Sequence, residues 1–191
     1  QSNTWVALPA TGFFVSTSGA FVTSSHVIHE HDYAGMVVMT GDGRVLPVKS
    51  ILADDENSDV AILQAEGDTV AALPIEESGD IGTRVTVMSH PVGRFFTLTQ
   101  GVVTRRSVQR DGPHSQEMLE ISAEFGPGSS GGPVLNQRGN VIGWVNSLRV
   151  WDGAAHGTPG SPALTFRECG VAKSILDLTR FPNDTTTHNA Q

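Results

Sequence analysis

Short apolar runs separated by turn residues recur along this chain, roughly every 10–15 residues. Examples are residues 20–23, 60–63, 83–88 and 140–146, and a Gly-Asp-Gly hairpin signal separates two further runs at residues 41–43. The 191 residues include 21 glycines and 10 prolines, and only 17% are charged. This pattern is typical of strands in a sandwich or barrel, and it argues against a helix bundle or a coiled coil.

One helix is predicted, near the end of the chain. Val171, Ile175 and Leu178 are spaced i, i+4 and i+7, so a helix would place them on one apolar stripe. A charged segment within residues 74–82 interrupts the apolar pattern, and we place the division between two halves there. Residues 182–191 are polar, and we expect this tail to be disordered.

Composition argues against several classes of function. The net charge is −8, the wrong sign for a phosphate-binding surface, so nucleic acid is not expected as a partner. No apolar run approaches the ~18 residues of a membrane span. The single cysteine, Cys169, allows neither an intramolecular disulfide nor a cysteine-based zinc site. Residues 1–4 lack the basic start and apolar core of a signal peptide, so we expect no leader within this chain.

A glycine-rich segment carries the strongest chemical signal. Residues 126–133 read Gly-Pro-Gly-Ser-Ser-Gly-Gly-Pro, so four glycines surround Ser129 and Ser130. Glycines let a ligand approach the main chain closely, and a serine on such a turn can lie beside N–H groups that stabilise an oxyanion. Taken alone, the segment is equally well explained as a flexible Gly/Ser loop.

A nucleophilic serine needs a general base, because its hydroxyl is a poor nucleophile at neutral pH. His26 directly follows a predicted strand, and Asp59 directly precedes the apolar run at residues 60–63. An aspartate there would hold an imidazole in one tautomer. Asp54 and Asp55 compete for that role, but neither adjoins the buried run. Each residue alone is more often structural; the order His26, Asp59, serine is the specific signal.

These residues together resemble the chymotrypsin-like serine peptidases, most closely the HtrA/Deg branch, whose peptidase domains lack structural disulfides. The resemblance covers about residues 10 to 180. It is carried by residues 12–28 ending in Thr-Ser-Ser-His-Val-Ile, by Asp-Val-Ala-Ile-Leu at 59–63, by residues 82–101, by Gly-Ser-Ser-Gly-Gly-Pro at 128–133, and by Cys-Gly-Val-Ala at 169–172. Three departures are Ser89-His90 where a glycine is common, Ser129 in place of an aspartate, and no PDZ domain.

The resemblance implies an all-β peptidase domain over residues 1–180, built of two six-stranded antiparallel barrels and a short C-terminal helix. The first barrel would span about residues 5–76, the second about 80–168, and the helix about 171–180. His26, Asp59 and Ser130 would be the catalytic triad of a serine endopeptidase that forms an acyl-enzyme. The backbone N–H groups of Gly128 and Ser130 would form the oxyanion hole. With Ser129 in place of the aspartate, the salt bridge that activates digestive relatives is not available.

The family also implies partners and a compartment. The expected partner is a polypeptide substrate, no cofactor or metal is required, and both a monomer and a homo-oligomer are compatible with the sequence. Members of this branch are mostly periplasmic, extracellular or organellar, which favours a periplasmic or extracellular location.

The primary specificity pocket is expected at Glu124, Phe125, Asn146 and Ser147. Glu124 lies six residues before Ser130, where trypsin-like members carry the acid that selects arginine or lysine. An unpaired carboxylate buried in a pocket is costly, so we expect Glu124 to point outward, with Phe125 at the pocket base. We therefore predict a preference for small or medium apolar residues before the scissile bond over basic ones.

Other interpretations stay open at this point. An idle relative that only binds peptides would carry the same residues. Gly128-x-Ser130-x-Gly132 also matches the nucleophile elbow of α/β-hydrolases, although those place the acid and histidine after the serine. His26, His29, His31 and Asp32 have ligand chemistry suited to zinc, with a solvated surface stretch as the alternative. Cys169 precedes the predicted helix, where a buried cysteine behaves as a small hydrophobe rather than a nucleophile.

Overall fold

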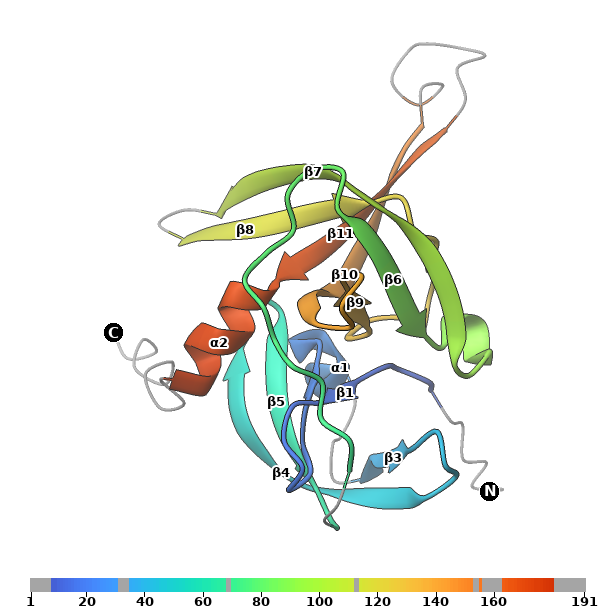
Figure 1. Cartoon of the computed structure of the whole chain (residues 1–191), viewed down its shortest axis with the longest axis vertical. Coiled ribbons are helices and arrows are strands. Elements are labelled where there is room, and N and C mark those ends of the chain that lie inside the picture. Colours follow the sequence, from blue (N-terminus) through green and yellow to red (C-terminus); the bar gives the residue numbers. More distant parts are fainter. Residues whose placement is uncertain are drawn as a thin grey trace.

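The described residues form two antiparallel sheets, a short helix between them and a C-terminal helix (Figure 1). The computed structural model describes residues 8–30, 35–67, 70–111, 114–152, 155 and 163–180. The all-β class predicted from the sequence is confirmed, and so are the two antiparallel sheets and the short helix. The tail at residues 182–191, predicted to be disordered, lies outside the described residues.

The N-terminal half forms a sheet of five strands within the described residues, in the order β1-β2-β5-β4-β3. The strands are β1 (Phe13–Phe14), β2 (Ala20–Thr23), β3 (Val37–Met39), β4 (Val45–Asp55) and β5 (Val60–Ala65). The central strand β5 is the continuous apolar run of the sequence, and five of its six residues are buried between β2 and β4. Two register shifts in β4 bend this sheet.

The C-terminal half closes into a barrel of six strands, counted over the described residues, in the order β10-β11-β8-β7-β6-β9. The strands are β6 (Arg84–Ser89), β7 (Thr97–Asp111), β8 (His114–Ile121), β9 (Pro133–Leu135), β10 (Val141–Trp151) and β11 (Leu164–Val171), with a short 3₁₀ turn at Pro91–Gly93. Alternate residues of β6 point inward, where Val85 and Val87 join a core with Val103 and Leu119.

The first half differs from the expected six-stranded closed barrel in one respect. Among the residues that the structure describes, its sheet has five strands and its two edge strands, β1 and β3, do not pair with each other. β1 has only two residues and β3 only three, so neither edge presents a ladder long enough to close the sheet.

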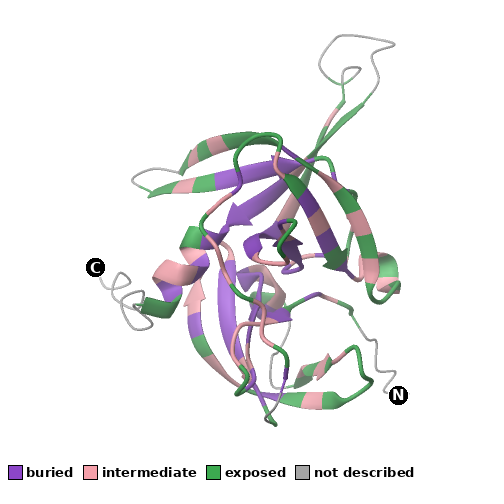
Figure 2. Cartoon of the chain, in the orientation of Figure 1, coloured by how far each residue is buried: buried purple, intermediate pink, exposed green. Residues whose placement is uncertain are grey.

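A shared apolar core and the helix α2 (Ala172–Arg180) join the halves. Ile175 and Leu178 of α2, from the predicted stripe, pack with Trp144 of β10 and with Phe13 and Val60 of the first sheet. Val171 is buried too, but it ends β11 rather than starting the helix. Figure 2 shows buried residues on both sheets where they face each other. None of the helices in the described ranges is long and apolar enough to cross a bilayer.

Candidate active site

His26 and Asp59 form a hydrogen-bonded pair where the two sheets meet. His26 lies on α1 (Ser25–His29), which follows β2 and lies between the two sheets in Figure 1. Its Nδ1 is 3.0 Å from both carboxylate oxygens of Asp59, and its backbone N–H donates to Asp59 Oδ1 at 2.9 Å. The imidazole and its backbone are therefore held by one carboxylate, as expected of a base and its orienting acid.

Asp59 adopts a backbone conformation that suits its position. Its φ is +52°, in the left-handed region that aspartate tolerates better than most residues. Its backbone N–H donates to Glu56 O at 3.3 Å, and its carbonyl accepts the indole N–H of Trp144 at 3.2 Å. A tight turn before β5 and a side chain of the second barrel thus fix the acid.

The competing aspartates bind other groups. Asp54 accepts the Ser25 hydroxyl at 2.7 Å and lies 2.7 Å from His29 Nε2. Asp55 accepts backbone N–H groups of the turn that follows it. Of the three aspartates considered from the sequence, the structure brings Asp59 to His26.

The pair shifts the titration of His26. The hydrogen bond that His26 donates to Asp59 raises the pKa of His26 above its ordinary value of 6.5. Burial lowers this pKa, and the charges of Asp59 and Glu30 raise it further. The imidazolium that forms when His26 accepts a proton is therefore stabilised in place.

The segment before Ser130 is a type II turn. The backbone N–H of Ser129 donates to Gly126 O at 3.0 Å, and Pro127 and Gly128 occupy the two central positions. Gly128 has φ +92°, which this turn requires at its third residue and which glycine adopts without strain. The turn ends at Ser129, directly before the candidate nucleophile Ser130.

Four successive carbonyl groups in this loop, those of residues 127–130, each accept a hydrogen bond. The donors, in the order of the acceptors, are the N–H of Val92 at 2.7 Å, the hydroxyl of Thr11 at 2.8 Å, the N–H of Gly132 at 2.9 Å and the N–H of Thr11 at 3.1 Å. A trans peptide directs its N–H opposite to its carbonyl, so these bonds also fix the directions of the N–H groups.

The N–H groups of the same loop divide into two kinds. Those of Ser129 and Gly131 donate to Gly126 O and Val145 O. Those of Gly128 and Ser130 donate to no acceptor among the described residues. Backbone N–H groups are normally paired. The two unpaired donors lie on either side of Ser129, and they are available for an external acceptor such as an oxyanion.

Ser130 lies beside the strand end that leads to His26. Gly131 has φ +84°, and a Cβ there would meet the carbonyl of Thr11 and the side chain of Thr23. Ser24 donates its hydroxyl to Val145 O at 3.3 Å, the carbonyl that also accepts the N–H of Gly131. The Ser130 hydroxyl itself makes no hydrogen bond to His26 or to any other described residue. Such bonds are often long in the absence of substrate.

The residues expected to form the specificity pocket take separate partners. Glu124 is 78% exposed and accepts a hydrogen bond from Arg167 Nη2 at 2.9 Å. Phe125 packs against the core of the second barrel. Asn146 lies at a register shift of β10, and the Ser147 hydroxyl donates to Glu168 at 2.9 Å.

Sequence reasoning missed Arg167 and Thr11. Arg167 is 43 residues from Glu124 along the chain, and Thr11 is 117 residues from Gly128. Neither residue belongs to a motif, and only the strand pairing brings them to their partners.

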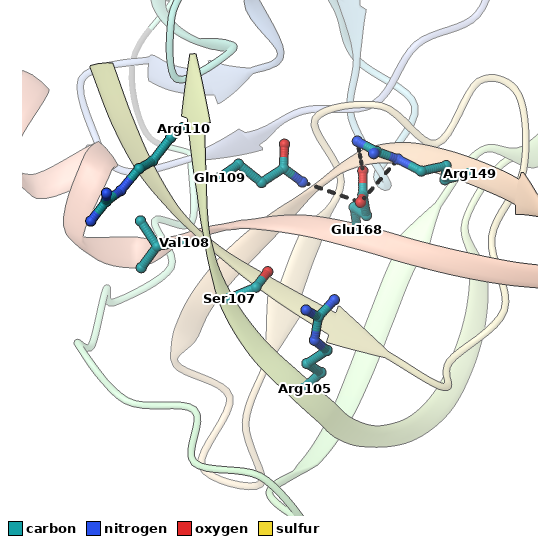
Figure 3. A pocket seen from close by; sticks show the side chains of 7 residues that line it. All are labelled: Arg105, Ser107, Val108, Gln109, Arg110, Arg149 and Glu168. Carbon is teal, nitrogen blue, oxygen red and sulfur yellow. Dashed lines mark hydrogen bonds and ion pairs between the residues drawn. The ribbon is translucent and has the colours of Figure 1, made fainter. Parts of the chain in front are cut away.

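A polar cavity of about 350 Å³ lies on the second barrel (Figure 3). Arg105, Arg110, Arg149 and Glu168 are among the residues that line it. Glu168 accepts hydrogen bonds from Gln109 at 3.1 Å and from Arg149 at 3.3 Å. None of the triad or oxyanion residues lines this cavity, so we do not assign the reaction to it.

The alternative nucleophile and metal sites find limited support. Cys169 is fully buried, and burial raises the pKa of its thiol, so it behaves as a core residue. His26 pairs with Asp59, whereas His29 lies near Asp54 and Glu56, so the two histidines do not share a set of ligands. His29, Asp54 and Glu56 lie close enough together to hold a metal ion, but His29 and Glu56 are exposed. The hydrogen bond that His29 makes to Asp54 raises the pKa of His29 above its ordinary value. His31 and Asp32 lie outside the described residues.

Comparison with known proteins identifies a family. A family model described as the trypsin-like peptidase domain matches residues 10–143. A probable periplasmic serine endoprotease, DegP-like, of Hahella chejuensis is 32% identical over 72% of this chain and 29% of its own length. The putative serine protease HhoA of Synechocystis is 33% identical over 76% of this chain and 38% of its own length. The chain thus spans about a third of these relatives.

Solved structures show the same fold. The HtrA-type protease AlgW with a decapeptide superimposes with a TM-score of 0.74 at 20% identity, over 90% of this chain and 50% of that one. A serine endoprotease from Yersinia pestis gives 0.70 at 21% identity, over 90% and 56%. From the family match and the relatives' identity, we conclude that this chain belongs to the trypsin-like peptidase domain family.

Proposed function

We propose that this chain is a serine endopeptidase domain that hydrolyses peptide bonds through Ser130, His26 and Asp59. The observation that carries the proposal is the loop at residues 127–131, in which the N–H groups on either side of Ser129 stay unpaired while every carbonyl from 127 to 130 is bonded. The His26–Asp59 pair supports it by supplying an oriented base next to the same loop.

The chemistry follows from these roles. His26 accepts the Ser130 proton through Nε2 as Ser130 Oγ attacks the substrate carbonyl, while Asp59 stabilises the imidazolium at Nδ1. The oxyanion accepts hydrogen bonds from the N–H groups of Gly128 and Ser130. His26 then gives its proton to the leaving amine. Water next attacks the acyl-enzyme while His26 accepts its proton, and His26 returns that proton to Ser130 Oγ as the acid product leaves. The mechanism invokes no cofactor.

The two other functions considered from the sequence have weaker support. Peptide binding alone does not require an aspartate that is hydrogen-bonded to both the ring and the backbone of His26. A nucleophile elbow needs a strand, a sharp turn and a helix in succession, whereas Ser130 follows a type II turn and precedes the strand β9.

The proposed substrate is a polypeptide with a small or medium apolar side chain before the scissile bond. The outward position of Glu124 supports this preference, and the guanidinium of Arg167 compensates its charge. A carboxylate already paired with arginine is a poor selector for a basic substrate.

We propose a periplasmic or extracellular location. One relative is named as periplasmic, whereas HTRA2 relatives of Drosophila are named as mitochondrial. Whether the domain forms a homo-oligomer is a question for sedimentation velocity on the purified protein.

Labelling with a fluorophosphonate tests the activity directly. The serine oxygen displaces fluoride from phosphorus, so only a serine activated by a base is modified at neutral pH. We expect stoichiometric labelling, mapped by mass spectrometry to Ser130, together with cleavage of an unfolded protein. A folded protein whose Ser130 stays unlabelled and which cleaves nothing would show that the domain is idle.

A further inference from the structure

We propose that Thr11 is a positioning residue that holds the oxyanion loop in its working conformation. It lies in the segment before β1, is 4% exposed, and contacts the loop at two points. Its hydroxyl donates to Gly128 O at 2.8 Å, and its backbone N–H donates to Ser130 O at 3.1 Å. This inference rests on the proposed function of the loop.

The two carbonyls that Thr11 binds belong to the peptide groups next to those of the oxyanion hole. The Gly128 N–H comes from the 127–128 peptide and the Ser130 N–H from the 129–130 peptide, whereas Thr11 holds the 128–129 and 130–131 peptides. The 129–130 peptide therefore has a held peptide plane on each side, and the 127–128 peptide lies between the 128–129 peptide and the 126–127 peptide, whose carbonyl accepts the Ser129 N–H. With both neighbours held, each of these peptides can turn only by a concerted change of the two soft dihedrals that flank it. Thr11 therefore restricts the directions of both N–H donors without touching the substrate.

The loop needs such a restraint because of its own sequence. Gly128 and Gly131 both have positive φ, and glycine can adopt many other backbone conformations with little strain. A peptide that rotates would turn its N–H away from the oxyanion. Thr11 is itself buried and its hydrogen bond to Gly128 O is partly buried, so water competes with this bond less than it would at an exposed site.

The direction of the Thr11 hydroxyl proton is itself determined. Thr11 Oγ1 accepts the backbone N–H of His90 at 3.1 Å, which occupies a lone pair and leaves the single proton for Gly128 O. The Thr11 carbonyl accepts the hydroxyl of Thr23 at 2.8 Å, and Thr23 ends the strand before His26. Thr11 thus connects the oxyanion loop to the end of β2, the strand directly before the helix that carries His26.

Two substitutions separate the hydroxyl from the rest of the side chain. Thr11→Val keeps the shape and removes the two hydrogen bonds of the hydroxyl, to Gly128 O and from the His90 N–H, while the backbone bond to Ser130 O stays. Thr11→Ser keeps the hydroxyl and removes a methyl group. Thr97→Val is the matched control, because its hydroxyl donates to Arg94 O at 2.8 Å on the same barrel and outside the loop. Each variant is assayed for kcat and KM on a peptide substrate.

We expect Thr11→Val to lower kcat by about 10–100-fold with KM within about threefold, since a displaced oxyanion donor acts on the transition state. We expect Thr11→Ser and Thr97→Val to stay within about threefold of the parent. Equal kcat for Thr11→Val and the parent would overturn the inference. So would equal losses in Thr11→Val and Thr11→Ser, because the methyl group would then be the important part.

Amide hydrogen exchange gives a readout that needs no activity. The bonded N–H groups of Ser129 and Gly131 report on the order of the loop, and we expect faster exchange in Thr11→Val than in Thr11→Ser. Unchanged exchange would contradict the inference even if the domain proves idle, whereas failure of the parent protein to label at Ser130 would contradict only the proposed function. If Thr11→Val does not fold, Thr11→Ala against Thr11→Ser makes the same comparison.

Discussion

Asp59 binds His26 twice, through the imidazole Nδ1 at 3.0 Å and through the backbone N–H at 2.9 Å. The carboxylate of Asp59 therefore fixes the orientation of the imidazole ring and of the His26 backbone.

The rate of cleavage should rise with pH through the pKa of His26. His26 must be neutral to act as the base. The hydrogen bond that it donates to Asp59 raises the pKa of His26 above 6.5, so the protonated, inactive form persists to a higher pH than for a free histidine. We expect kcat/KM to be low at pH 5 and to reach its plateau above the raised pKa. A profile that is flat from pH 5 to 9 would contradict His26 as the base.

Asp59→Asn should lower kcat by about 10⁴-fold, because the amide favours the wrong tautomer of His26. Removing the raising interaction should also move the pH inflection of any residual activity downward. Asp54→Asn is the control, since Asp54 binds Ser25 and His29 instead. If Asp54→Asn causes the larger loss, the acid has been assigned to the wrong residue.

Ser130→Ala should abolish both labelling and cleavage while leaving the melting temperature nearly unchanged. The Ser130 hydroxyl makes no hydrogen bond within the described part of the chain, so its removal costs the fold little. Ser129→Ala is informative beside it, because Ser129 is fully buried and accepts the Gly126 N–H at 3.3 Å. We expect that variant to lose about 1 kcal/mol of stability in urea denaturation. Normal turnover by Ser130→Ala would remove the nucleophile from the mechanism.

Gly131→Ala should be far more damaging than Gly139→Ala. Both residues have positive φ, +84° and +79°, so both substitutions carry backbone strain of about 1–2 kcal/mol. At Gly139 the new methyl meets nothing within 4 Å, whereas at Gly131 it meets the Thr11 carbonyl and Thr23. Chemical denaturation and kcat should both show the difference. Equal stability losses would mean that the close approach at Gly131 does not constrain the loop.

Peptides with valine or alanine before the scissile bond should be cleaved better than those with arginine or lysine. Arg167→Gln should narrow this gap, because it frees the carboxylate of Glu124 from its partner. A peptide library varied at that one position gives the ratio. At least tenfold better cleavage of the basic peptides, erased by Glu124→Gln, would show that Glu124 selects the substrate.

The periodic part of the sequence predicted most of the fold, for a physical reason. Strand β5 is a continuous apolar run because it is buried between two neighbours, and the stripe of Ile175 and Leu178 is visible because one face of α2 is buried. The runs on either side of the Gly-Asp-Gly signal form β3 and β4, so these strands left a pattern in the sequence. The closed six-stranded barrel of the first half was implied by the resemblance alone, and the described residues form five strands there.

Sequence reasoning could propose candidate site residues that lie beside glycines or strand ends, but not residues that act across the chain. His26, Asp59 and Ser130 each adjoin such a signal. Thr11 and Arg167 act through contacts with residues 117 and 43 positions away. A threonine or an arginine with a distant partner looks like any other in a linear pattern.

The apolar cluster that contains Phe13, Val60, Trp144 and Ile175 draws on both sheets and on the helix. Neither half can unfold without exposing the inner face of the other. Melting should therefore be one cooperative event, and no half-folded form would keep the His26–Asp59 pair while losing the serine loop. On heating, the proposed peptidase activity and the folded structure should be lost over the same temperature range, with no partly folded form that retains activity.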